Sequence, residues 1–255
     1  MSKIDKIMKK IFAFAAISSA LFISCKKDLE QPADWSSVAV IHTSPVSSAS
    51  PDTLHVFFND LRSNSNGILY NNNSTYLPVL AGPKTVGIRR GATTASSSYI
   101  NSFEYSFEKG KSYSLFVYDT TTSATGLAKL LRLKDDLTLP AVNMSHIRLL
   151  HLAPNASAVD VTLVRTSVTP NDSITIANRS YVGASPNEEA LSVFTAVPRG
   201  TYTAKVKTAG TQNVLTSSTV TLTTGASVSE GRIVTVYVTG TAKGRPLAIG
   251  TFRHY

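Results

Sequence analysis

Short segments in which apolar and polar residues alternate follow one another along most of the chain. In residues 201–207, for example, Tyr202, Ala204 and Val206 alternate with threonine and lysine. A period of two is typical of β-strands with one face on a core, and Gly, Pro, Asn or Ser bounds most of these segments. We predict strands at residues 38–42, 54–58, 85–90, 99–107, 112–118, 127–133, 147–151, 159–164, 173–177, 201–207, 214–223, 232–238 and 247–252.

Several of these segments occur twice in the same order. Residues 38–45 and 147–154 each form an apolar strand that ends in a histidine, His42 or His151, with a proline three residues later, Pro45 or Pro154. Residues 112–118 likewise match residues 232–238, each after a glycine-containing turn. A repeated order of strands is most simply explained by two copies of one domain.

The strand spacing then predicts the architecture. About seven strands in roughly 100 residues per copy are typical of an antiparallel, immunoglobulin-like β-sandwich. We therefore predict an all-β protein with two tandem sandwiches of this type, at residues 37–134 and 146–255. Residues 135–145 combine charge with proline and are the predicted linker.

The N-terminus has the pattern of an export signal. Lysines in residues 3–10 precede an apolar run from Ile11 to Ile23 that is too short to span a membrane. Residues 21–25, which end in the single cysteine Cys25, resemble the lipobox of bacterial lipoproteins, in which that cysteine is lipidated. We expect a signal peptide at residues 1–24 and a polar tether at 25–36. Lipidated Cys25 would make the membrane a partner.

The residues after Cys25 bear on location. In the lipoproteins that this segment resembles, Asp directly after the cysteine retains the protein in the inner membrane, and here Lys26 occupies that place. The resemblance implies the outer membrane. The short charged tether of Lys27, Asp28 and Glu30 favours the cell surface over the periplasmic face.

Composition narrows the class further. Hydrophobic residues make up 42% of the 255 residues and charged residues 16%, so the chain can bury a core. The formal net charge is +9, but lysine and arginine are scattered apart from Arg89-Arg90, which argues against a nucleic-acid partner. With no cysteine after Cys25, the mature fold must hold together without a disulfide.

The opening of the second copy carries a family resemblance. The strand that ends at His151, then Ala153-Pro154-Asn155-Ala156, then Val159-Asp160-Val161, resembles the start of the family of domains of unknown function numbered 4397. The first copy departs from this pattern, because its loop is longer and His55 stands where the second copy has Asp160. The resemblance implies exported β-domains, often in tandem and often in lipoproteins, and it implies no activity.

Motifs that indicate catalysis are missing from the sequence. It contains no Gly-x-Ser-x-Gly elbow, His-Glu-x-x-His zinc motif, phosphate-binding loop or calcium loop. We expect no enzyme, no cofactor and no metal. A hydrolase triad assembled in space stays open as a distant alternative, because catalytic groups need not be neighbours in sequence. His42 and His151 could act as ligands or acid–base groups, but a ring N–H donated to a loop carbonyl in a structural turn with Pro45 and Pro154 is favoured.

One loop of the first copy combines aromatic rings with amides. Tyr70 and Tyr76 flank Asn71, Asn72 and Asn73, and glycan-binding surfaces combine rings with amides in this way. Asparagine runs also form plain turns, which is the favoured interpretation. If a glycan binds, this loop is the predicted contact.

A second polar surface is predicted on the strand at residues 201–207. Lys205 and Lys207 lie two residues apart and so share a face, which could meet an acidic polysaccharide, although a solvated strand face is the default. The function we predict is a non-catalytic envelope module that binds glycan or protein. The alternative is a structural spacer or subunit of an outer-membrane assembly.

Overall fold

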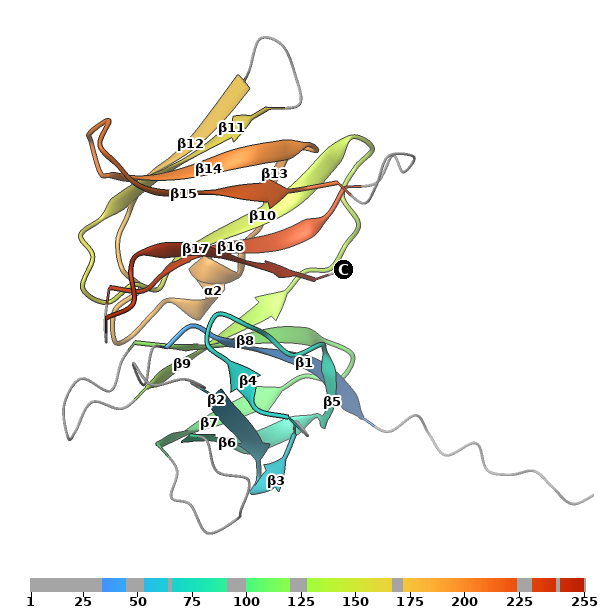
Figure 1. Ribbon diagram of the computed structural model, residues 1–255. Helices are drawn as coiled ribbons and strands as arrows, with labels where there is room; N and C mark the ends of the chain where they lie inside the picture. The colour runs from blue at the N-terminus through green and yellow to red at the C-terminus, as the bar shows by residue number, and fades with distance from the viewer. Residues whose placement is uncertain are drawn as a thin grey trace, which may run out of the picture. The chain divides into compact units, whose positions relative to one another are not determined.

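Figure 1 shows the computed structural model, in which β-strands form nearly all of the regular structure. The structure describes residues 34–44, 53–63, 66–90, 100–119, 128–166, 172–223, 231–241 and 244–254. All of these except Asp34 lie in the unit Trp35–Tyr255. The signal peptide, Cys25, most of the predicted tether and Pro45 lie outside the described residues.

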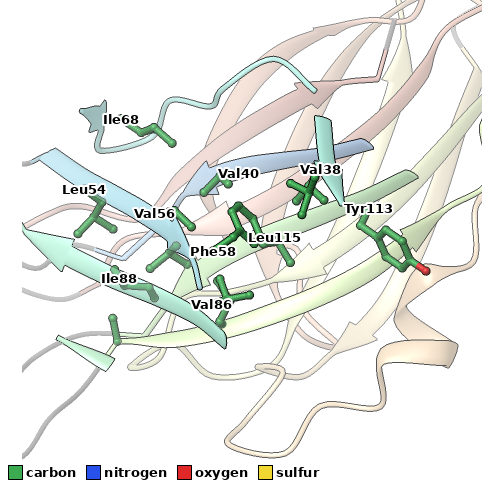
Figure 2. Packing of buried hydrophobic residues seen from close by; sticks show 14 of the residues in the cluster. Val38, Val40, Leu54, Val56, Phe58, Ile68, Val86, Ile88, Tyr113 and Leu115 are labelled. Carbon is green, nitrogen blue, oxygen red and sulfur yellow. The ribbon is translucent and has the colours of Figure 1, made fainter. Parts of the chain in front are cut away.

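Two sheets enclose the first hydrophobic core. Sheet A has the strand order β5-β1-β8-β9, and sheet B has the order β3-β2-β6-β7 with β4 also paired to β2. Side chains such as Val38, Leu54 and Leu115 fill the space between them, as Figure 2 shows. The bounds are β1 Trp35–His42, β2 Thr53–Phe58, β3 Leu61–Arg62, β4 Ile68–Leu69, β5 Leu77–Leu80, β6 Gly82–Arg90, β7 Asn101–Phe107, β8 Ser112–Tyr118 and β9 Lys129–Asp135.

Two further sheets enclose a second core. Sheet C has the order β13-β10-β16-β17 and sheet D the order β12-β11-β14-β15. Alternation on β14 turns Tyr202, Ala204 and Val206 into this core, as the sequence pattern predicts. The bounds are β10 Met144–His151, β11 Val159–Arg165, β12 Asp172–Arg179, β13 Thr195–Pro198, β14 Thr201–Thr208, β15 Val214–Thr221, β16 Ile233–Thr239 and β17 Ala248–Arg253.

The β-sandwich class predicted from the sequence is confirmed, with one difference in topology. In sheet A the ladder between β1 and β8 is parallel, and in sheet C the ladder between β10 and β16 is parallel too. The other ladders between the described strands are antiparallel, so the two halves share one strand order that a purely antiparallel prediction did not include. Parallel neighbours need a long connection, and here the intervening strands of the opposite sheet supply it. The immunoglobulin-like detail stays a prediction.

The strands that the sequence pattern missed are short and lie at sheet edges. β3 and β4 have two residues each, and β5 and β13 have four. Pro78 lies in β5 and Pro198 in β13. Proline has no N–H group to donate, and it is tolerated in edge strands because one side of such a strand has no partner. Alternation cannot be recognised over so few residues.

One short helix, α2 (Glu188–Ser192), precedes β13. The side chain of Asn187 accepts a hydrogen bond from the backbone N–H of Ala190, which caps the first turn. The connection between the halves is residues 136–143, because Asp135 ends β9 and Met144 begins β10. Independent folding of the two predicted domains stays a prediction.

Candidate binding site at the seam between the sandwiches

A third buried layer lies between sheets A and C, and we call it the seam. It is made of side chains from the faces of sheets A and C that point away from the two sandwich cores. The ring of Phe116 on β8 meets the ring of Tyr237 on β16 edge to face, with 5.8 Å between the ring centroids. The fully buried members are Ala39, Ile41, Phe116, Tyr118, Leu131, Leu133, Leu150, Leu152, Tyr237 and Phe252.

An ion pair is buried at one end of the seam. Arg148 Nη2 of β10 lies 2.9 Å from Asp135 Oδ1 of β9, and the two side chains are 1% and 0% exposed. The other carboxylate oxygen, Oδ2, accepts hydrogen bonds from Ser114 Oγ at 2.6 Å and Tyr76 Oη at 2.8 Å. A buried charge is stable only when it is paired and hydrogen-bonded, and Asp135 meets both conditions.

His254 extends this network. Tyr76 donates its single hydroxyl proton to Asp135, so the contact of 2.6 Å between His254 Nδ1 and Tyr76 Oη requires the proton on Nδ1. In the neutral ring, Nε2 accepts from Thr235 Oγ1 at 2.9 Å, and that oxygen accepts from Arg148 Nε at 3.1 Å. Burial lowers the pKa of His254 to about 4.

This lowered pKa predicts a stability that depends on pH. Between pH 6.5 and 4 the unfolded chain binds a proton at His254 that the folded chain does not, so the free energy of unfolding should fall as the pH falls through this window. The decrease amounts to as much as about 3 kcal/mol, at about 1.4 kcal/mol per pKa unit. Urea denaturation at pH 7 and pH 4.5 measures it.

The control for this prediction is His254→Gln, which keeps polar atoms in place but does not titrate. Burial also lowers the pKa values of His55 and His151, so this variant should flatten the pH dependence without abolishing it. An unchanged slope in His254→Gln would contradict the assignment.

The network brings a serine, a histidine and an aspartate together, but their hydrogen bonds differ from those of a hydrolase triad. Ser114 Oγ donates to Asp135, and His254 contacts Tyr76 and Thr235 instead of the serine. A nucleophilic serine needs the histidine as its base. Across the part of the chain that the structure describes, no group of three or more His, Cys, Asp or Glu side chains is placed to hold a metal ion.

A pocket of about 860 Å³ opens beside the buried ion pair. Its walls come from both halves of the protein: the turn before β8 and strand β9 on one side, and α2 with the residues after it on the other. Residues 136–138 and His146 complete it. This volume lies within the range of about 300 to 1,000 Å³ that is usual for small-molecule sites.

The charged side chains of the pocket largely neutralise one another. Arg132 donates from Nε and Nη2 to Glu188 Oε2 at 3.1 and 3.0 Å, which fixes α2 against β9. Lys134 Nζ pairs with Glu108 at 2.8 Å, and Asp135 has its own cation in Arg148. The other acidic and basic side chains on the wall are Lys111, Asp136, His146 and Glu189.

The loop predicted from sequence to contact a glycan touches the second sandwich. Tyr76 is part of the seam network, and Asn71 Oδ1 accepts a hydrogen bond from Tyr237 Oη at 3.0 Å. Tyr70 contacts Thr239 at 3.3 Å, and the Arg245 guanidinium lies 4.8 Å from the centroid of its ring. The side chains of Asn72 and Asn73 are exposed. Both tyrosine rings that such a contact would use are therefore engaged in protein contacts, and a glycan contact at this loop stays a prediction.

The two repeated histidines occupy equivalent strand ends. His151 Nδ1 accepts from the backbone N–H of Ala153 at 3.3 Å, so Nε2 carries the proton and donates to the carbonyl of Ser157 at 3.1 Å. This contact holds the turn that contains Pro154. His42 is buried at the end of β1, and its ring meets the edge of Tyr70. At His151, both hydrogen bonds of the ring are made with backbone groups, those of Ala153 and Ser157.

Sequence reasoning missed the residues that make the seam network. Asp135 was assigned to a linker, and His254 and Ser114 carried no motif. Arg148 offered one signal, because a single arginine within an apolar strand must find a partner when that strand is buried. In the described residues, no helix has the length and apolar character needed to cross a membrane.

Comparison with known proteins gives a family match and two distant structures. The family model of DUF4397, described as a domain of unknown function, matches residues 36–162, which cover the first sandwich and reach into β11. A leucine-rich repeat protein from Bacteroides thetaiotaomicron VPI-5482 is 15% identical with a TM-score of 0.23. That alignment covers 73% of this chain and 24% of the other, so the chain spans about a quarter of its length.

A second solved structure aligns over most of both chains. It is the "Putative cell adhesion protein" of Parabacteroides distasonis ATCC 8503, with 10% identity and a TM-score of 0.21, covering 86% of this chain and 98% of the other. Among curated proteins, none matches this chain.

Proposed function

We propose that this chain, whose residues 36–162 match the family model of the domain of unknown function DUF4397, is a non-catalytic binding module that holds a neutral glycan in the pocket beside the seam. The observation that carries this proposal is a pocket built from both halves of the protein, in which most of the charged groups are already paired. The proposal includes lipid anchoring of Cys25 in the outer membrane, with the module at the cell surface.

The pairing of charges favours an uncharged polar ligand. Arg132 with Glu188 and Lys134 with Glu108 present fixed donors and acceptors, while their net charges cancel. An ion would have to compete with these partners, whereas hydroxyl groups can bond to the lone pairs and N–H groups that remain. A saccharide carries many such hydroxyls. Lys111 and Glu189, which have no ion pair of their own on the pocket wall, are the expected direct contacts.

The experiment uses residues 26–255, which contain the whole unit Trp35–Tyr255, on an array of neutral and acidic glycans. The double variant Lys111→Ala with Glu189→Ala should weaken binding at least about tenfold, because hydrogen bonds to charged groups contribute about 1.5 to 3 kcal/mol each. Lys84→Ala is the matched control, because the ammonium group of Lys84 bonds to the carbonyls of Ala81 and Pro83 and does not line the pocket, so this variant should bind like the unmodified protein.

Other outcomes separate the alternatives. If Asn72→Ala weakens binding and the pocket variant does not, the glycan lies on the loop of the first sandwich. If no glycan binds, the proposal fails and the spacer or assembly-subunit function takes its place. That second function is favoured by one observation, the buried seam, because it joins the two sandwiches into one stiff element.

A further inference from the structure

Strand β12 forms an open edge of sheet D. It pairs with β11 on one side, and among the described strands none pairs with its other side. Six of its eight residues are exposed, and Figure 1 shows it at the margin of the sheet. An unpaired edge presents a row of free N–H and C=O groups that can pair with another strand.

The part of this edge that precedes Asn178 lacks the usual protection against pairing. Natural edge strands are shortened or bulged, or they carry lysine or proline, whereas residues 173–177 of β12 are Ser-Ile-Thr-Ile-Ala. The ladder shifts register between Val159 and Val161, which places one extra residue in β12 beside Asn178, whose φ is 50°, whereas residues 172–176 pair regularly with β11. The corresponding edge of sheet B is blunted, because there only the two-residue strands β3 and β4 pair with β2.

We propose that β12 pairs with β12 of a second copy of this chain, so that two copies of sheet D join into one continuous sheet. The pairing is antiparallel about a two-fold axis, which is the commonest symmetry of homodimers. When the axis is perpendicular to the sheet, the inner faces of the two copies lie on the same side of the joined sheet. Residues of the inner face therefore stand opposite inner-face residues of the second copy, and outer-face residues stand opposite outer-face residues. Thr175 lies within residues 172–176, which pair regularly with β11, and we place it on the axis because this register sets the two isoleucines of β12 opposite each other.

This register matches side chains on both faces. On the inner face Ile174 stands opposite Ile176 of the second copy, and both isoleucines already pack against the second core and are only partly buried. On the outer face the two Thr175 side chains meet, and each already lies 3.1 Å from Thr162 of its own chain. Cross-strand aliphatic and threonine pairs of this kind stabilise sheets. The strand is therefore complementary to itself.

The test measures the dimer dissociation constant of residues 26–255 by sedimentation velocity. Thr175→Lys puts two like charges on the two-fold axis and should raise this constant at least about tenfold, which is about 1.4 kcal/mol. Thr219→Lys is the matched control, because Thr219 is an exposed threonine on β15 at the opposite edge of the same sheet. It should leave the dimer unchanged.

Cross-linking supplies a second measurement that does not depend on disruption. Residues 26–255 contain no cysteine, so Thr175→Cys introduces a single thiol on the axis, where paired residues come within disulfide reach. Mild oxidation should give a covalent dimer from Thr175→Cys and none from Thr219→Cys. A protein that stays monomeric up to about 1 mM, or a dimer that survives Thr175→Lys, would overturn the proposal.

Discussion

Arg148→Met should lower the free energy of unfolding at pH 7 by about 3 to 5 kcal/mol, the cost of removing one partner from a buried ion pair. The variant leaves the carboxylate of Asp135 at 0% exposure without its cation. Ser114 and Tyr76 still donate to Oδ2, but Oδ1 loses its charged donor. Domains are stable by only about 5 to 15 kcal/mol, so the loss is a large fraction of the total.

Urea denaturation of residues 26–255 measures this effect, and two further variants define it. Arg165→Met removes the ion pair with Asp172, whose side chain is 50% exposed, and should cost at most about 1 kcal/mol. Combining Arg148→Met with Asp135→Asn removes the stranded charge, so the double variant should be more stable than Arg148→Met alone. A cost for Arg148→Met no greater than that for Arg165→Met would show that the pair is not buried in solution.

The strands with one face on a core could be predicted from the sequence. β14 alternates buried and partly buried residues over its length, and its polar threonines and lysines mark the solvent face directly. Each strand of more than four residues begins and ends within a few residues of its prediction. The sequence could not predict the short strands β3, β4, β5 and β13. These strands are recognised only by their hydrogen bonds to a longer neighbour, because so few residues show no alternation of their own.

Two strands of the seam, β8 and β16, have a sequence pattern that predicts burial of both faces. All seven residues of β16 are buried, and six of the seven of β8 are. A strand that is apolar on both faces must be covered on both faces. A sandwich core covers only one face of a strand, so the apolar residues on both faces of β8 and β16 indicate a further buried layer.

The seam network could not have been derived from spacing. Asp135 and His254 lie at the ends of the two halves and meet only because sheets A and C pack against each other. Their positions follow from the packing of whole sheets, which no local pattern encodes. The pocket has the same origin, since its walls come from segments far apart in the chain.

Phe116→Ala should uncouple the two sandwiches as well as destabilise the protein. Phe116 is fully buried in the seam, and its removal leaves a cavity that costs about 3 to 5 kcal/mol. The neighbouring residue Leu115 points to the opposite face of β8, into the first core, so Leu115→Ala is a control of similar cost at a different place. Only the change at Phe116 removes contacts between the halves.

Limited proteolysis followed by gel filtration under native conditions distinguishes the loss of contacts between the sandwiches from a loss of stability within one sandwich. The connection at residues 136–143 carries exposed side chains such as Leu139 and Val142 and should be the first site cut. The two fragments of the unmodified protein should elute together, because the seam still holds them, and so should those of Leu115→Ala. The fragments of Phe116→Ala should separate, because the seam is weakened while both sandwich cores are intact. If the unmodified fragments separate as well, the seam does not join the halves in solution, and a pocket that needs both of them could not hold a ligand.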